Sequence, residues 1–129
     1  MIKSRHKLML LLTLTSSIFT FSSATQAGDA SAGQAVYNGK GACTGCHGNS
    51  GAGDGAAAVA FNPRPANFST AAFRLDTNGN GKPGEDVDII NIIKYGAQKY
   101  GGNVGMAGRA DLSEDEVGSL LAFIRSLKK

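Results

Sequence analysis

The clearest pattern of apolar and polar positions lies at the C-terminal end of the chain. Ser113 and Glu116 stand at the two positions of a capping box, a motif that starts many α-helices. After them, apolar side chains recur every three or four positions, the spacing of one buried helix face: Val117, Leu120, Leu121, Ile124 and Leu127. We therefore expect a helix that begins after Ser113 and carries this stripe as far as Leu127, with Lys128 and Lys129 at its C-terminal end.

Two shorter segments upstream show the same helical spacing. Asp29 can cap a helix that runs to about Tyr37 and places Gly33 and Tyr37 on one face. Residues 85–95 are amphipathic, and Gly96 ends that pattern. No segment alternates as a β-strand does, and glycine-rich loops separate the helices. The pattern predicts an all-α fold of short helices and loops.

The N-terminal segment follows a different pattern. Three basic residues precede an apolar stretch from Leu8 to Phe21, and small residues ending at Ala27 follow it. This order predicts a signal peptide over residues 1–27 that is cleaved, and one domain over residues 28–129. The apolar run is short against the about 20 residues that span a bilayer. An uncleaved membrane anchor is therefore the less favoured alternative.

Removal of this leader changes the charge of the chain. The sequence carries 13 basic and 10 acidic residues, and three of the basic ones but none of the acidic ones lie in the leader. The remaining chain is formally neutral, with ten residues of each sign. Because nucleic-acid binding requires a concentrated basic face, the composition does not support a nucleic-acid partner.

The strongest chemical signal is the pentapeptide Cys43-Thr44-Gly45-Cys46-His47. The pattern C-x-x-C-H attaches a c-type haem, with one thioether at each cysteine and the histidine as an iron ligand. A dithiol redox site would expect a βαβ pattern, zinc would need further ligands, and a disulfide would close a small strained ring. A haem would also give this short glycine-rich chain the apolar centre that it otherwise lacks.

The second axial ligand is the next question. Once the leader is removed, His47 is the only histidine and Met106 the only methionine. The candidates are therefore Met106, a lysine, or no residue. A buried methionine is usually core filler, but Met106 lies between Gly105 and Ala107-Gly108, where small residues allow close approach to a flat ligand. We expect Met106 to be the ligand, and Met/His ligation favours electron transfer over substrate chemistry at the iron.

The chain from Gly28 to Lys129 resembles the bacterial class I c-type cytochromes, which are small monohaem electron carriers. The resemblance rests on Gly33 and Tyr37, on the C-x-x-C-H motif, on Met106, and on the ending L-S-E-D-E-V…L-L-A-F-I-R-S-L. It implies a cytochrome c-like fold wrapped around one covalent haem. It also implies that the first and last helices cross, with Gly33 and Tyr37 against Leu120 and Phe123.

The resemblance has two further implications for the haem site. The His47 ring is expected to donate a hydrogen bond to a backbone carbonyl near a proline, and residues 62–65 are the expected source. Arg64, which lies between Pro63 and Pro65, is a candidate contact for a haem propionate. The chain departs from many relatives in having alanine, not proline, directly after Met106.

Residues 76–87 suggest one other site. They begin D-x-N-x-N-G, as an EF-hand calcium loop does. The twelfth position should be a bidentate glutamate and is Val87 here. Asn-Gly and Pro-Gly pairs are ordinary turn formers, so we expect a plain turn, and Ca²⁺ at Asp76, Asn78 and Asn80 is disfavoured.

Together these features predict an exported, periplasmic c-type cytochrome that carries single electrons between redox proteins. It would be a monomer without enzymatic turnover, free of the membrane after cleavage, and would dock transiently at its haem edge. Two alternatives stay open. One is a five-coordinate gas-binding or catalytic haem protein, and the other is a dedicated electron-transfer subunit of a dehydrogenase or reductase complex.

Overall fold

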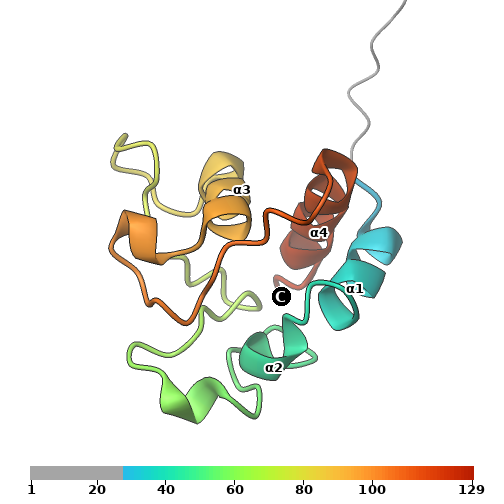
Figure 1. The fold of residues 1–129 in the computed structure, drawn as a ribbon, viewed down its shortest axis with the longest axis horizontal. Helices are drawn as coiled ribbons and strands as arrows, with labels where there is room; N and C mark the ends of the chain where they lie inside the picture. The colour runs from blue at the N-terminus through green and yellow to red at the C-terminus, as the bar shows by residue number, and fades with distance from the viewer. Residues whose placement is uncertain (1–27) are drawn as a thin grey trace, which may run out of the picture.

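The computed structural model describes residues 28–129, which form short helices joined by loops (Figure 1). The helices are α1 (Ala30–Asn38), α2 (Thr44–His47), η1 (Ala58–Ala60), α3 (Asp86–Tyr95), η2 (Gln98–Tyr100) and α4 (Glu114–Ser126), where η marks a 3₁₀-helix. This range contains no β-strand, which confirms the predicted all-α fold. None of its helices is long and apolar enough to cross a bilayer. The predicted signal peptide lies outside the described residues.

Helices α3 and α4 begin at capping boxes. In α4 the Ser113 hydroxyl accepts from the N–H of Glu116 at 3.2 Å, and the Glu116 carboxylate accepts from the N–H of Ser113 at 2.8 Å. In α3 the N–H of Glu85 donates to Asp88 at 3.0 Å. Helix α3 ends at Gly96, whose N–H donates to the carbonyl of Ile92. The predicted starts of both helices and the predicted end of α3 are confirmed.

Helices α1 and α4 cross at a glycine. A Cβ atom added to Gly33 would lie 1.9 Å from the carbonyl oxygen of Ser119 and 2.9 Å from the Cβ atom of Phe123. No larger residue fits there unless the helices move apart. Close by, the fully buried ring of Tyr37 meets Phe123 edge-on, with ring centroids 5.1 Å apart. This contact confirms the packing that was expected between the first and last helices.

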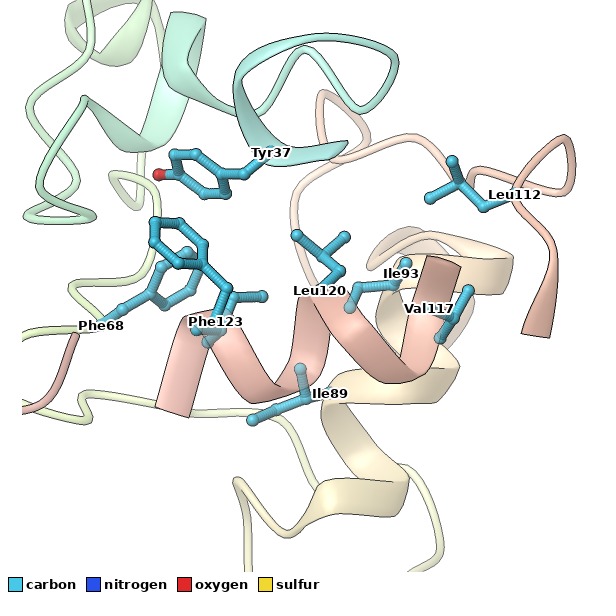
Figure 2. Close-up of a cluster of buried hydrophobic side chains, with 9 residues drawn as sticks. Tyr37, Phe68, Ile89, Ile93, Leu112, Val117, Leu120 and Phe123 are labelled. Carbon is cyan, nitrogen blue, oxygen red and sulfur yellow. The ribbon is translucent and has the colours of Figure 1, made fainter. Parts of the chain in front are cut away.

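The hydrophobic core lies against one face of α4 (Figure 2). Helix α4 buries four side chains: Val117, Leu120, Phe123 and Ile124. The other members of this cluster are Ile89 and Ile93 of α3, Tyr37 of α1, and Phe68 and Leu112 from loops. Leu121 and Leu127, which were predicted to share the stripe, are half-buried and pack against its edge. Each buried side chain of this kind contributes about 1.5–3 kcal/mol, so the cluster is the main attachment between the three helices.

Candidate functional site

The C-x-x-C-H segment forms α2, a single helical turn that follows α1 closely. The N–H of Cys43 donates to the carbonyl of Tyr37 at 3.0 Å, and the N–H of His47 donates to the carbonyl of Cys43 at 2.9 Å. Cys43 and Cys46 are free thiols that are partly buried. Burial raises the pKa of the Cys43 thiol. A reactive dithiol site depends on a lowered thiol pKa, so this environment does not favour the dithiol alternative.

His47 is held in one orientation from two sides. Its ring is 8% exposed and stacks on Phe68, with centroids 4.4 Å apart and planes at 17°. Its Nδ1 atom lies 3.1 Å from the carbonyl oxygen of Ala66. Burial lowers the pKa of His47, which favours the neutral ring. A neutral ring that donates from Nδ1 leaves the Nε2 lone pair available to bind a metal.

The source of this carbonyl corrects the expectation that it would come from residues 62–65. The carbonyl of Arg64 instead accepts from Arg74 at 2.8 Å. The carbonyl of Pro65 faces Gly53, where an added Cβ atom would lie 2.5 Å from the oxygen. The next carbonyl along the chain, that of Ala66, is the one directed at His47.

Tyr37 connects α1 to the end of the motif. Its hydroxyl donates to the carbonyl of Gly48 at 2.7 Å. Burial raises the pKa of the Tyr37 phenol well above its usual range, so the group stays protonated and remains a donor. The residue after His47 is thereby anchored to the helix that precedes the motif.

The motif opens onto a cavity of about 360 Å³. Helices α1, α2, α3 and α4 and the loops line it, and the lining is largely apolar. The apolar residues include Phe61, Pro63, Phe68, Leu75, Ile89, Ile92 and Leu120. Cys43, Cys46, His47 and Met106 all line it. Two thiols and a neutral imidazole beside an apolar space are the groups that attach a haem covalently and bind its iron, and the thioether of Met106 lines the same space.

Met106 reaches this cavity from a loop that is docked on the end of α3. The Met106 carbonyl accepts from the N–H of Ala97 at 2.9 Å, and the Met106 N–H donates to the carbonyl of Asn103 at 3.1 Å. A Cβ atom added to Gly96 would lie 2.8 Å from the nitrogen of Gly108. The glycines on the two sides of this contact therefore allow the loop to lie directly against the helix end. Met106 itself is half-buried.

Arg64 also lines the cavity and is exposed to solvent. Arg74 lines it as well and fixes the Arg64 backbone through the hydrogen bond described above. Neither guanidinium forms an ion pair within residues 28–129. No sequence pattern marks Arg74, because its partner is a backbone carbonyl, which any residue can supply.

The Asp76 loop is stabilised by hydrogen bonds from its own backbone. The Asp76 carboxylate accepts from the N–H groups of Gly79, Asn80 and Gly81 at 2.6–3.3 Å. Among the described residues, no group of three His, Cys, Asp or Glu side chains could hold a metal ion. The loop has the hydrogen bonds of a turn, in which the aspartate caps backbone donors.

The fold and this cavity define a small helical protein that carries a haem, and the comparisons agree. Residues 30–128 match the family described as Cytochrome c, so the chain belongs to the cytochrome c family. A chain of the reducing HAO-like protein complex of Kuenenia stuttgartiensis has a similar structure, at 30% sequence identity and a TM-score of 0.64. The match covers 80% of this chain and 44% of that chain, so this chain spans less than half of its relative. No curated protein sequence matches.

Membership of this family establishes the cofactor class. The protein carries a covalent haem c. Cys43 and Cys46 have the spacing that the attachment requires.

Proposed function

We propose that this protein is an exported, periplasmic monohaem cytochrome c that passes single electrons between redox partners. Cys43 and Cys46 form the thioethers, and His47 and Met106 are the two axial iron ligands. The bound haem supplies a one-electron iron couple. The observation that carries the proposal is that one apolar cavity brings together His47, with its Nδ1 already engaged, and Met106, which lies far away in the sequence.

The protein's own residues would hold the iron from both axial sides. Phe68 covers one face of the His47 ring, and the Ala66 carbonyl fixes the position of its other nitrogen. Met106, as the second proposed ligand, would fill the position at which a substrate or a gas could otherwise bind the iron. A site with both axial positions filled transfers electrons without binding a substrate, so the protein would not be an enzyme.

Docking would occur beside the cavity mouth. Val59 is 76% exposed and Val104 is 67% exposed. Their segments are neighbours, because a Cβ atom added to Gly105 would lie 2.2 Å from the ring of Phe61. Exposed apolar side chains next to the cofactor suit a small, short-lived contact with a redox partner. Arg64 at the same cavity is the proposed propionate contact.

A second candidate function is a dedicated subunit of an enzyme complex. It is favoured by the structural similarity to a chain of the reducing HAO-like protein complex, at 30% identity. In that case the protein would purify with a larger partner at fixed stoichiometry. A free carrier would purify alone, as a monomer.

An optical spectrum tests the proposed ligation. The oxidised protein should be low-spin and show the weak long-wavelength band of methionine sulfur bound to ferric iron. Met106→Ala should lose this band and bind CO readily in the reduced state. A high-spin wild-type protein that binds CO would support the five-coordinate alternative instead.

A further inference from the structure

We propose that Arg109 is a positioning residue that ties the Met106 loop to the segment entering the C-x-x-C-H motif, and so keeps Met106 directed into the cavity. The inference rests on the proposed ligation by His47 and Met106. The Arg109 side chain forms no hydrogen bond with Cys43, Cys46 or either proposed axial ligand.

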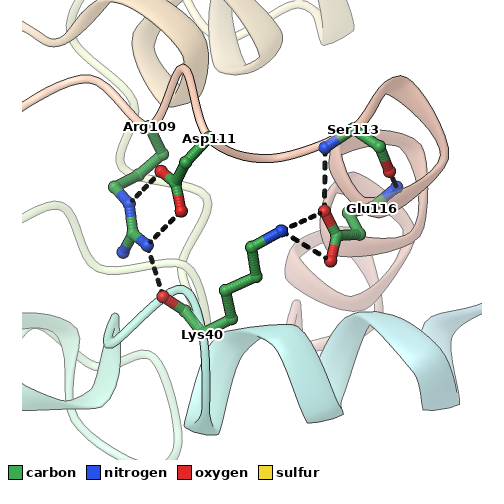
Figure 3. Close-up of polar contacts among 5 residues, drawn as sticks. All are labelled: Lys40, Arg109, Asp111, Ser113 and Glu116. Atoms are coloured by element: carbon green, nitrogen blue, oxygen red, sulfur yellow. Dashed lines mark hydrogen bonds and ion pairs between the residues drawn. The ribbon is translucent and has the colours of Figure 1, made fainter.

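The guanidinium of Arg109 bridges two segments that are distant in the sequence (Figure 3). Its Nη1 atom donates to the carbonyl of Gly41 at 2.5 Å, and its Nη2 atom donates to the carbonyl of Lys40. Nε and Nη2 also donate to the two carboxylate oxygens of Asp111, at 2.9 and 3.0 Å. A guanidinium engaged on both edges is fixed in one geometry, and its bonds are of the strong, charge-assisted kind.

One end of this bridge lies next to Met106. Arg109 follows Met106, Ala107 and Gly108 directly in the sequence. The Arg109 N–H donates to the carbonyl of Ile93 at 2.7 Å, which fixes the loop backbone on α3. Movement of the Met106 loop away from the cavity would break these hydrogen bonds.

The other end lies beside the first cysteine. A Cβ atom added to Gly41 would be 3.0 Å from the sulfur of Cys43 and 2.6 Å from the carbonyl oxygen of Val36. Lys40 is held in addition by its ammonium group, which lies 2.8 Å from Glu116 of α4 (Figure 3). The bridge therefore joins the Met106 loop to a segment that is itself fixed against α1 and α4.

Arg125 provides a matched control. Its Nε and Nη2 atoms donate to a carboxylate oxygen of Asp86 at 2.9 and 2.6 Å, and Nη2 donates to the carbonyl of Gly84 at 2.8 Å. Like Arg109, Arg125 donates from one guanidinium to one carboxylate and to backbone carbonyl oxygen. The segments that it joins are α4 and the start of α3, and the Met106 loop takes no part.

The test compares Arg109→Met with Arg125→Met in the mature haem-loaded protein. Imidazole displaces a methionine ligand from oxidised iron at a rate set by how often the ligand leaves. We expect Arg109→Met to raise this rate about tenfold or more, since it removes several charge-assisted hydrogen bonds, and to weaken the methionine-sulfur band. Arg125→Met should keep the wild-type rate and band. Both variants should melt at a lower temperature than the wild type.

Two further variants keep the test decisive. Arg109→Lys, which can reach only one carbonyl at a time, should give an intermediate rate. If Arg109→Met yields no haem-loaded protein, Asp111→Asn loosens the same guanidinium and should raise the rate by a smaller factor. Equal imidazole rates in the Arg109 and Arg125 variants, or a wild-type rate in Asp111→Asn, would overturn the inference. A wild-type protein without the methionine-sulfur band would overturn the proposed ligation first, and the inference with it.

Discussion

The two sides of the cavity are built by different means. On one side His47 sits on a helical turn, is 8% exposed, and has its ring fixed by the Ala66 carbonyl and the Phe68 face. On the other side Met106 lies in an irregular loop and is half-buried. Its backbone is held through Ala97 and Asn103, but no helix carries it.

This difference separates what the local sequence determines from what the tertiary structure determines. Five consecutive residues bring the two cysteines and His47 together on one helical turn, and only the orientation of the His47 ring depends on the distant contacts with Ala66 and Phe68. Met106 reaches the cavity only if α3 ends at Gly96 and the following loop docks on the end of that helix. Segments with fewer buried contacts open at lower free-energy cost. We therefore expect the Met106 side to be the first part of the site to open.

The largest contrast should come from truncating the two proposed ligands. His47→Ala leaves a cavity beside Phe68 and an unpaired carbonyl at Ala66, so it should lower the free energy of unfolding by about 4 kcal/mol. Met106→Ala removes a half-buried side chain and should cost about 2 kcal/mol. Chemical denaturation of the two haem-loaded variants measures both. Equal losses of unfolding free energy in the two variants would contradict this difference between the two sides.

Glycine substitutions sharpen the comparison without touching a ligand. Gly53 lies on the His47 side at φ 77°, and an added Cβ atom would be 2.5 Å from the carbonyl oxygen of Pro65. Gly101 lies on the Met106 side at φ 81°, with no atom within 4 Å of an added Cβ. Gly53→Ala should cost about 3 kcal/mol, from backbone strain and a steric clash. Gly101→Ala should cost about 1 kcal/mol, from backbone strain alone.

Thermal or chemical unfolding of these two alanine variants checks the difference. A Gly101→Ala variant as unstable as Gly53→Ala would show that the loop before Met106 is packed more tightly than its open surroundings imply.

The smallest effect concerns pH on the Met106 side. Hydrogen bonding to Arg109 lowers the pKa of the Asp111 carboxyl from 3.8 to about 2. Between these values the unfolded chain binds a proton that the folded chain does not, so folding stability rises with pH there. The contribution is complete above about pH 4 and is lost as the pH falls through about 2.

Asp111→Asn should therefore lose less thermal stability than the wild type on acidification across that window. The measurement is the unfolding midpoint of both proteins as a function of pH. Parallel curves would contradict the ion pair between Asp111 and Arg109.

The sequence predicts best the parts whose signals are local. Helix α4 follows from its apolar stripe and capping box, and α2 follows from the C-x-x-C-H motif. The carbonyl that meets His47 was predicted wrongly, because two prolines indicate an extended segment but not which of its carbonyls faces inward. That carbonyl comes from Ala66, one residue beyond the expected range.

Arg74 and Arg109 were missed for a related reason. Arg74 donates to the backbone carbonyl of Arg64. Arg109 donates to the backbone carbonyls of Lys40 and Gly41, which lie far away in the sequence. A backbone carbonyl is common to every residue, so no residue type marks the partner. Only the packed structure shows which arginines act as bridges.

One measurement tests the central claim directly. Met106 is the only methionine in residues 28–129, so a protein labelled at the methionine methyl group gives a single signal from these residues. In the reduced protein the ring current of the haem should move this methyl signal far upfield of its ordinary position if Met106 is the axial ligand. A methyl signal at the ordinary position, in a protein that has its haem attached, would contradict ligation by Met106.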